Sequence, residues 1–202
     1  MELKILELSS SHAFGAMEGE NIDSYLTVID EYEFATTDLS NYNVLMITYF
    51  VDQEYLYRHK DIIENFLNEG KVVVFCGHLF RSWLPGCSLF MPKEINSYQD
   101  YVVQTYSGAP LFDGVEIDDM VFYEGVAGFF ARGYYCPPEK AEVCLTFTDG
   151  KVISYVDRHT TNGTIIVHAG RTLLGYKDAK NTTKRIGQQT LDLLKEEVCG
   201  GK

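Results

Sequence analysis

Cys76, Gly77 and His78 stand where an apolar run ends, in the stretch KVVVFCGHLF (71–80). A cysteine at the end of a buried strand could act as a nucleophile, because the N–H groups of the turn that follows can stabilise an oxyanion. A histidine two residues later could transfer a proton near neutral pH. Cysteine is also among the residues most often buried in proteins. Three hypotheses follow: Cys76 is a nucleophile, His78 is the working residue, or the stretch is only a core strand.

Polar residues follow three other apolar runs of the chain. They are Ser10 and His12 after LKILELS, Asp52 and Gln53 after NVLMITYF, and His168 and Arg171 in TIIVHAGR. The carboxyl ends of parallel strands meet at one edge of a sheet, where ligands bind. We therefore expect these side chains to share one solvent-reachable hollow with residues 76–78.

Each candidate residue has an expected role in that hollow. His78 and His168 would handle protons, Cys76 would be the nucleophile of an enzymatic version, and Asp52 would orient a ligand. The expected ligand contacts are Ser10, His12, Gln53, Gly77 and Arg171. Two alternatives stay open. Asp52 could instead cap the helix that follows it, and His168 could be a hydrogen-bonded core histidine.

A metal site is a weaker hypothesis. His12, Asp52, His78 and Glu124 could gather around an ion, but no local spacing such as His-x-x-x-His supports it. The glycines of GVAGFFARG do not have GxGxxG spacing and do not follow a strand. We therefore expect no metal and no cofactor.

The elements that position these residues alternate in the first half of the chain. Strands are predicted over 3–9, 32–37, 43–50 and 71–76, and helices over 20–32 and 54–70, with Gly70 ending the second helix. Apolar strands of this kind need cover on both faces. The order β-α-β-β-α-β predicts an α/β fold, with a flavodoxin-like, mostly parallel sheet and helices on both faces.

The second half has a different pattern. The segment 118–135 holds short strand-like pieces broken by glycines. Asp149-Gly150 and Asn162-Gly163 each separate strand-like runs, which predicts two tight hairpin turns and a C-terminal antiparallel meander. A closing amphipathic helix is predicted over 183–198. No linker or repeat interrupts the chain, so we expect a single domain over 1–202.

Composition limits the classes of partner. The chain has 202 residues, a net charge of −12 and a pI of about 4.8, which disfavours nucleic acid and membrane partners. Five cysteines without a Cys-x-x-Cys pair indicate a reducing compartment, and neither a signal peptide nor a membrane span is evident. We expect a cytoplasmic protein with a small-molecule ligand. Aromatic residues near Trp83 and in GFFARGYY could also mediate contact with a protein partner or a second copy, although core packing is the safer interpretation of most of them.

Residues 41–80, NYNVLMITYFVDQEYLYRHKDIIENFLNEGKVVVFCGHLF, look like the core of the class I glutamine amidotransferase-like superfamily. The resemblance is nearest to its trehalose-utilisation (ThuA-like) branch. APLFDGV (109–115) is similar to the family's His-Pro-Leu-Phe-x-Gly-Val stretch, with Ala109 where histidine is usual. NGTIIVHAGRTLLGY (162–176) looks like the family's final strand. The resemblance covers about residues 3–176 and implies the same fold.

The resemblance departs from true glutaminases at the catalytic residues. Their nucleophile elbow is Gly-x-Cys-x-Gly, whereas Val74 and His78 flank Cys76 here. The glutamate expected two residues after His168 is Gly170. We therefore expect an amidotransferase-like domain that binds or processes a small polar metabolite without being a true glutaminase. The alternative is a non-catalytic binding or assembly module on a degenerate copy of this fold.

Overall fold

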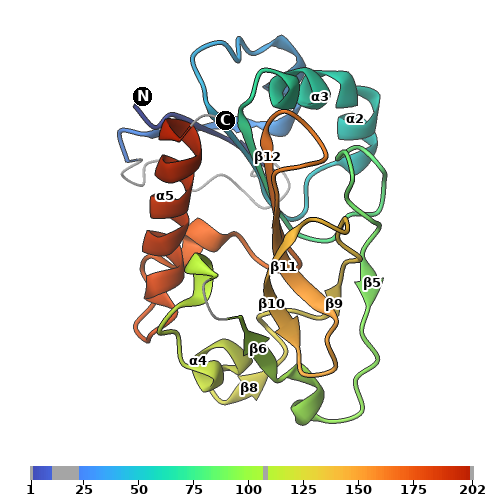
Figure 1. The fold of residues 1–202 in the computed structure, drawn as a ribbon, viewed down its shortest axis with the longest axis vertical. Helices are drawn as coiled ribbons and strands as arrows, with labels where there is room; N and C mark the ends of the chain where they lie inside the picture. Colours follow the sequence, from blue (N-terminus) through green and yellow to red (C-terminus); the bar gives the residue numbers. More distant parts are fainter. Residues whose placement is uncertain (1, 11–22, 107–108, 201–202) are drawn as a thin grey trace.

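The computed structural model describes residues 2–10, 23–106 and 109–200, and its centre is an eight-stranded sheet (Figure 1). The strands lie in the order β2-β1-β3-β4-β12-β11-β10-β6. In that order their bounds are Leu26–Asp30, Ile5–Ser9, Val44–Ile47, Val72–Cys76, Thr164–His168, Val152–Asp157, Glu142–Phe147 and Val103–Thr105.

Neighbouring strands from β2 to β12 run parallel to one another. Every residue of β4 and of β12 is buried, so both faces of these strands are covered. Figure 1 shows α5 (Lys184–Cys199) on one side of the sheet and α2 (Gln53–Arg58) and α3 (Lys60–Asn68) on the other. The predicted α/β fold with a mostly parallel sheet is confirmed.

The strands β12, β11, β10 and β6 form the antiparallel part of the sheet, as the second half of the sequence predicts. Gly150 has a φ of +84° in the β10–β11 turn, so the tight turn at Asp149-Gly150 is confirmed. The tight turn predicted at Asn162-Gly163 is wrong, because residues 158–163 form a longer connection. Gly163 serves packing instead: a Cβ atom there would lie 2.1 Å from the carbonyl oxygen of Lys71.

The helix predicted over 20–32 is wrong in its described part. Leu26–Asp30 forms β2, which pairs in parallel with β1 at the sheet edge. Three consecutive β-branched residues, Thr27, Val28 and Ile29, favour a strand, and pairing with β1 overrides the helical spacing of the apolar residues.

The strand predicted over 32–37 is also wrong. Glu31–Thr36 forms a 3₁₀ helix, η1. The Asp30 carboxylate caps its first turn by accepting a hydrogen bond of 2.9 Å from the backbone N–H of Tyr32. The second strand of the sheet thus comes one segment earlier than the sequence pattern indicates.

The other predicted helices are present. The helix predicted over 54–70 is divided into α2 and α3 at His59, whose φ of −112° is not helical. Gly70, with a φ of +80°, follows the end of α3 as predicted. The closing helix is α5. No helix in the described part of the chain is long and apolar enough to cross a membrane.

Short elements lie between β4 and β10 and after β12. They are β5 (Met91–Pro92), η2 (Tyr98–Tyr101), η3 (Pro110–Phe112), α4 (Ile117–Val121), β7 (Phe122–Tyr123), β8 (Val126–Ala127), β9 (Gly133–Tyr134) and η4 (Leu173–Tyr176). β5 pairs with β9, and β7 pairs with β8.

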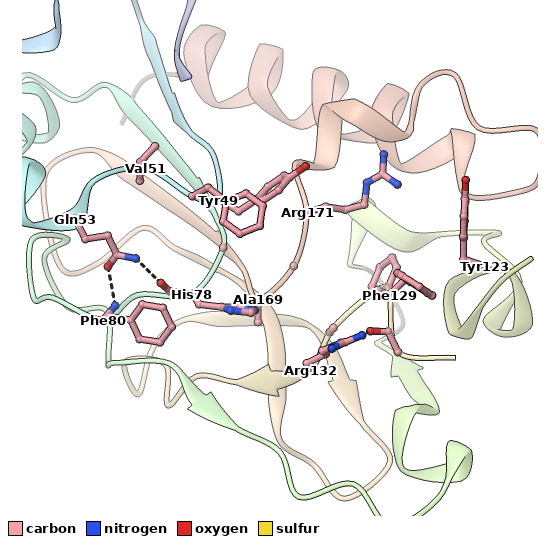
Figure 2. Close-up of a pocket in the computed structure, with 16 residues that line it drawn as sticks. Tyr49, Val51, Gln53, His78, Phe80, Tyr123, Phe129, Arg132, Ala169 and Arg171 are labelled. Carbon is pink, nitrogen blue, oxygen red and sulfur yellow. Dashed lines mark hydrogen bonds between the residues drawn. The ribbon is translucent and has the colours of Figure 1, made fainter. Parts of the chain in front are cut away.

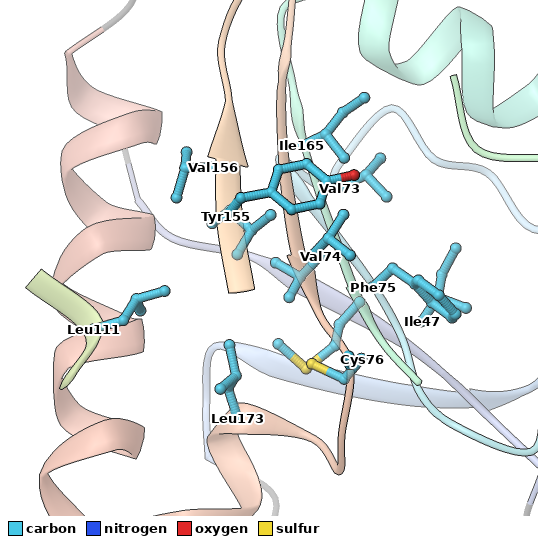
Figure 3. Packing of buried hydrophobic residues seen from close by; sticks show 14 of the residues in the cluster. Ile47, Val73, Val74, Phe75, Cys76, Leu111, Tyr155, Val156, Ile165 and Leu173 are labelled. Atoms are coloured by element: carbon cyan, nitrogen blue, oxygen red, sulfur yellow. The ribbon is translucent and has the colours of Figure 1, made fainter. Parts of the chain in front are cut away.

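A core of buried apolar side chains packs around β4 (Figure 3). Alternate residues of β4 point to opposite faces of the sheet. Phe75 lies against the indole of Trp83, with ring centroids 5.0 Å apart. Cys76 points the other way, toward Leu173. Trp83 is only 1% exposed, so its side chain fills the core, as the core-packing alternative predicts.

Candidate functional site

A cavity of about 840 Å³ opens beyond the carboxyl ends of β3, β4 and β12 (Figure 2). Its other wall is the segment that contains β8 and the residues before β9. The lining comprises Tyr49, Phe50, Val51, Gln53, Gly77, His78, Phe80, Tyr123, Gly128, Phe129, Phe130, Ala131, Arg132, Ala169, Gly170 and Arg171. A volume of this size suits a small-molecule ligand. The position is the one expected for a site in a parallel sheet.

The chain turns sharply at Gly77, and this turn separates the core from the cavity. Gly77 has a φ of +151°, and a Cβ atom there would lie 3.2 Å from the Cα atom of Tyr49. Its N–H donates to the carbonyl oxygen of His168 over 2.9 Å. The Tyr135 hydroxyl fixes the turn, because it donates to the Gly77 carbonyl oxygen (2.7 Å) and accepts from the N–H of Leu79 (3.0 Å). Glycine is required here for both conformation and space.

Gln53 holds the same loop from the other side. Its Nε2 atom donates to the His78 carbonyl oxygen over 2.6 Å, and its Oε1 atom accepts from the N–H of Phe80 over 2.7 Å (Figure 2). Gln53 lines the cavity, as predicted for a ligand contact, but these bonds make it a residue that positions the loop 78–80.

His78 is half-buried at the cavity wall, where its ring stacks on Phe90 with centroids 3.8 Å apart. Burial, and then the positive charge of Arg132, lower the pKa of His78 below its usual value. The imidazole is therefore neutral near pH 7, with one N–H donor and one acceptor. No hydrogen bond to this ring comes from the residues the structure describes.

Two arginines border the cavity with His78. The Nε atom of Arg132 donates to the Gly128 carbonyl oxygen over 2.8 Å. The guanidinium of Arg171 lies 4.8 Å from the centre of the Tyr176 ring. Neither forms an ion pair with a carboxylate of the described residues. Its position after a strand predicts Arg171 as a ligand contact. Arg132 was not predicted, because it follows a glycine-rich aromatic run and not a strand.

Cys76 and His168 are register partners at the ends of β4 and β12, and both are fully buried. Burial raises the pKa of the Cys76 thiol to about 12. The Ser154 hydroxyl lies 2.5 Å from Nδ1 of His168. Burial, and then the charge of His78, lower the pKa of His168 to about 3. Neither residue is among the described residues that line the cavity, so their catalytic roles stay predictions without support from this geometry.

Asp52 begins α2 as its capping residue. Its Oδ1 atom accepts from the N–H groups of Glu54 (2.9 Å) and Tyr55 (3.0 Å), and its Oδ2 atom accepts from the Tyr32 hydroxyl (3.0 Å). The bond from Tyr55 is the largest of the causes that lower the pKa of Asp52. The helix-capping alternative is confirmed, and the predicted ligand contact finds no support.

The remaining candidates lie apart from the cavity or beyond the description. Ser10 is buried after β1 and is not among the described lining residues. His12 lies outside the described residues. Within 2–10, 23–106 and 109–200, no three His, Cys, Asp or Glu side chains are grouped so that they could hold a metal ion. Of the residues expected to share one hollow, the cavity lining includes Gln53, Gly77, His78 and Arg171. It does not include Ser10, Asp52, Cys76 or His168.

No protein-family model matches the chain, and no curated protein sequence matches it. Among solved structures, "Cytoplasmic Protein STM1381" from Salmonella typhimurium LT2 is similar, with a TM-score of 0.56 and 9% identity over 99% of this chain and 100% of that chain. A β-galactosidase from Rahnella sp. R3 is similar with a TM-score of 0.53 and 16% identity, over 96% of this chain and 31% of that chain.

The exo-β-1,4-mannosidase Op5Man5 from Opitutaceae bacterium strain TAV5 has a TM-score of 0.47 and 10% identity, over 98% of this chain and 34% of that chain. This chain spans about a third of the length of each glycosidase. At identities of 9% and 16%, the likeness to the Salmonella protein and to the β-galactosidase shows the fold alone.

Proposed function

We propose that this chain is a class I glutamine amidotransferase-like domain that binds a small polar metabolite in the cavity beyond β3, β4 and β12, and that it is not a glutaminase. The single observation that carries the proposal is the separation at Gly77. His78 lies on the cavity side of this turn, whereas Cys76 and His168 lie on the core side.

The protonation states of these residues favour binding over glutaminase chemistry. A cysteine nucleophile needs an accessible thiolate, and a partner base must accept a proton near pH 7. The pKa of about 12 for Cys76 and of about 3 for His168 are opposite to both needs. The ring of His78 lines the cavity and accepts no hydrogen bond from, and donates none to, the residues that the structure describes, so in our proposal it orients the ligand.

Ligand screening by thermal shift and by native mass spectrometry tests the proposal. We expect a polar metabolite to bind the wild-type protein, His78→Gln to weaken that binding roughly tenfold, and His159→Gln to leave it unchanged. His159 is an exposed histidine in the connection after β11, far along the sheet from the lining. No ammonia release from glutamine is expected.

Two results would refute this proposed function. The first is release of ammonia from glutamine that Cys76→Ser abolishes, because this result would indicate a glutaminase activity that depends on Cys76. The second is a ligand whose affinity is the same in the wild type and in His78→Gln.

We also keep an assembly role as the second candidate. Large aromatic side chains surround the mouth of the cavity, and Phe50 and Phe80 are 67% and 62% exposed. A protein partner or a second copy could cover them. If so, light scattering should show an oligomer of the wild type that Phe80→Ser reduces to monomers; a monomeric wild type would remove self-association.

A cytoplasmic location belongs to the same proposal. All five cysteines lie in the described part of the chain, and none of them is in a disulfide bond. Five cysteines without a disulfide suit a reducing compartment.

A further inference from the structure

The cavity lining has a charge opposite to that of the whole chain. The chain carries a formal net charge of −12. The described lining residues nevertheless include Arg132 and Arg171 and no aspartate or glutamate. In such an acidic protein, a concave surface that bears only positive charge attracts anions.

Most other arginines of the described chain have carboxylate partners. Arg58 and Arg81 both pair with Glu54, and Arg158 pairs with Glu142 and Glu197. The guanidinium groups of Arg132 and Arg171 are instead steadied by a carbonyl oxygen and by an aromatic ring. Neither contact supplies a negative charge to the guanidinium group. The remaining N–H groups of such a guanidinium form a planar set of hydrogen-bond donors that fits a carboxylate or a phosphate.

Arg132 lies close enough to His78 for its charge to lower the pKa of that imidazole. A neutral imidazole can still donate one hydrogen bond to an anion without adding charge. The backbone on the other side of the cavity is Ala169-Gly170, which leads directly to Arg171. His78 and Arg132 therefore line the same space from opposite walls, whereas the guanidinium of Arg171 is turned toward the edge of the cavity (Figure 2).

A neighbouring cavity of about 530 Å³ supplies a contrast. It shares Tyr123, Phe129, Phe130 and Arg171 with the first cavity. Its own lining adds three carboxylates, Asp119, Glu124 and Asp178. An anionic group is therefore disfavoured there and favoured on the side of His78 and Arg132.

The rest of the first cavity is aromatic. Six of its described lining residues are Tyr49, Phe50, Phe80, Tyr123, Phe129 and Phe130. Phe129 and Tyr123 are each 57% exposed at the rim, so their faces are open to a ligand. Phe50 adopts a φ of +70°, a conformation uncommon for a residue with a side chain and frequent at ligand sites. Aromatic faces stack on flat apolar groups.

We propose that the ligand of this cavity is a small organic anion, a carboxylate or phosphate monoester, that carries a flat apolar group. Arg132 and His78 hold the anionic group, Arg171 adds positive charge at the edge of the cavity, and the aromatic rim holds the flat group. This inference rests on the proposed function, because it names the ligand class of the same cavity.

Calorimetry with matched compounds tests the ligand class. Phenyl phosphate and phenylacetate carry both an anion and a ring, 2-phenylethanol lacks the charge, and inorganic phosphate and acetate lack the ring. We expect one of the first two compounds to bind at least roughly tenfold more tightly than 2-phenylethanol and than the matching inorganic phosphate or acetate. Added sodium chloride should weaken this binding, because the interacting charges are exposed to solvent. Comparing phosphate with carboxylate then identifies the preferred anion.

Arginine variants identify the residues that hold the anion. We expect Arg132→Gln to weaken binding roughly tenfold and Arg171→Gln to weaken it by a smaller factor, because Arg171 lies at the edge of the cavity. Arg132→Lys and Arg171→Lys should recover part of the loss, because the charge remains but the planar set of donors does not. Arg185→Gln is the matched control: Arg185 is an exposed arginine of α5 without a carboxylate partner among the described residues, and it does not line the cavity. Its affinity should stay within about twofold of the wild type. Unchanged melting curves establish that these surface variants are folded.

The outcomes separate the two proposals. If 2-phenylethanol or a neutral sugar binds as tightly as the anions, or if neither arginine variant weakens binding, the anion inference is overturned and the proposed function stands. If neither the anions nor any compound of the metabolite screen binds in the cavity, both are overturned.

Discussion

Two groups of potentially reactive side chains lie on opposite sides of one turn, and their environments differ completely. On the core side, Cys76 and His168 are fully buried and are held neutral by that burial. On the cavity side, the ring of His78 is half-buried and lines the same cavity as two arginines. Only one residue, Gly77, separates Cys76 from His78. Residue type and strand position are therefore not sufficient for a catalytic role, because the backbone conformation at the strand end decides which side chains meet solvent.

Glu7 extends the core side of this comparison. It lies in β1, and its charge raises the pKa of Cys76. Burial raises the pKa of Glu7 itself to about 7. On the core side, burial shifts the pKa values of the titratable groups so that their neutral forms are favoured, whereas on the cavity side the arginines carry permanent positive charge. Unfolding stability and cysteine alkylation test the core side, and titration of the histidine rings compares the two sides directly.

The largest expected effect is on stability. His168→Ala should lower the free energy of unfolding by about 3 kcal/mol, because it leaves a cavity in the core and removes the partner of the Ser154 hydroxyl. His78→Ala should cost only about 1 kcal/mol, because that ring is half-buried and loses mainly its stacking on Phe90. Urea denaturation of both variants measures the difference. Equal losses in the two variants would contradict the assignment of His168 to the core.

A smaller effect, which depends on pH, is expected at Glu7. The folded-state pKa of about 7 lies above the unfolded value of 4.5. The stability that the protonated form contributes is therefore fully present below pH 4.5 and is lost as the pH rises through about 7. Glutamine cannot ionise, so Glu7→Gln should be as stable as the wild type near pH 4.5 and more stable by about 1–2 kcal/mol at pH 8.5.

His168 provides an internal check on this prediction. Its folded-state pKa of about 3 lies below the ordinary value of 6.5, so its contribution has the opposite sign: stability is lost as the pH falls below 6.5. In the wild type, protonation of Glu7 offsets part of the stability that is lost through His168 as the pH falls. Glu7→Gln lacks this offset. Urea denaturation between pH 5 and 8.5 should show a steeper loss at acid pH than in the wild type; identical curves for the two proteins would mean that Glu7 is not perturbed.

The smallest expected effect is the absence of a reaction. Iodoacetamide at pH 8 should modify the exposed Cys136 and Cys199 and leave Cys76 unmodified, because its thiol is buried and has a pKa of about 12. Mass spectrometry of digested samples measures the modification of each cysteine, and labelling in urea shows that every thiol can react once unfolded. Rapid labelling of Cys76 in the folded protein would return it to the list of candidate nucleophiles.

Much of the fold follows from sequence pattern. The runs that form β4 and β12 are apolar throughout, which predicts buried parallel strands, and the turn at Gly150 follows from its residue types. The failures occur at the sheet edge. Leu26–Asp30 has helical spacing of its apolar residues, yet it pairs with β1 as a strand. The choice between helix and strand depends here on the partner strand, which the local sequence does not reveal.

The candidate site was harder to predict. Sequence position places His78 and Arg171 at strand ends, and both line the cavity. Sequence position cannot show that the Asp52 carboxylate accepts the hydrogen bonds that cap α2, or that His168 faces Ser154 inside the core. Arg132 and the aromatic wall come from a segment without long strands, so only the three-dimensional fold brings them opposite β4 and β12.

Nuclear magnetic resonance of the histidine rings tests the central comparison most directly. The five histidine signals can be assigned with single His→Gln variants and followed in a pH titration, with and without phenyl phosphate. The account predicts that the His168 signal stays in its neutral form from pH 8 to about pH 5 and ignores the ligand, whereas the His78 signal moves when phenyl phosphate is added. Protonation of His168 near pH 6.5, or a ligand response at His168 instead of His78, would contradict it.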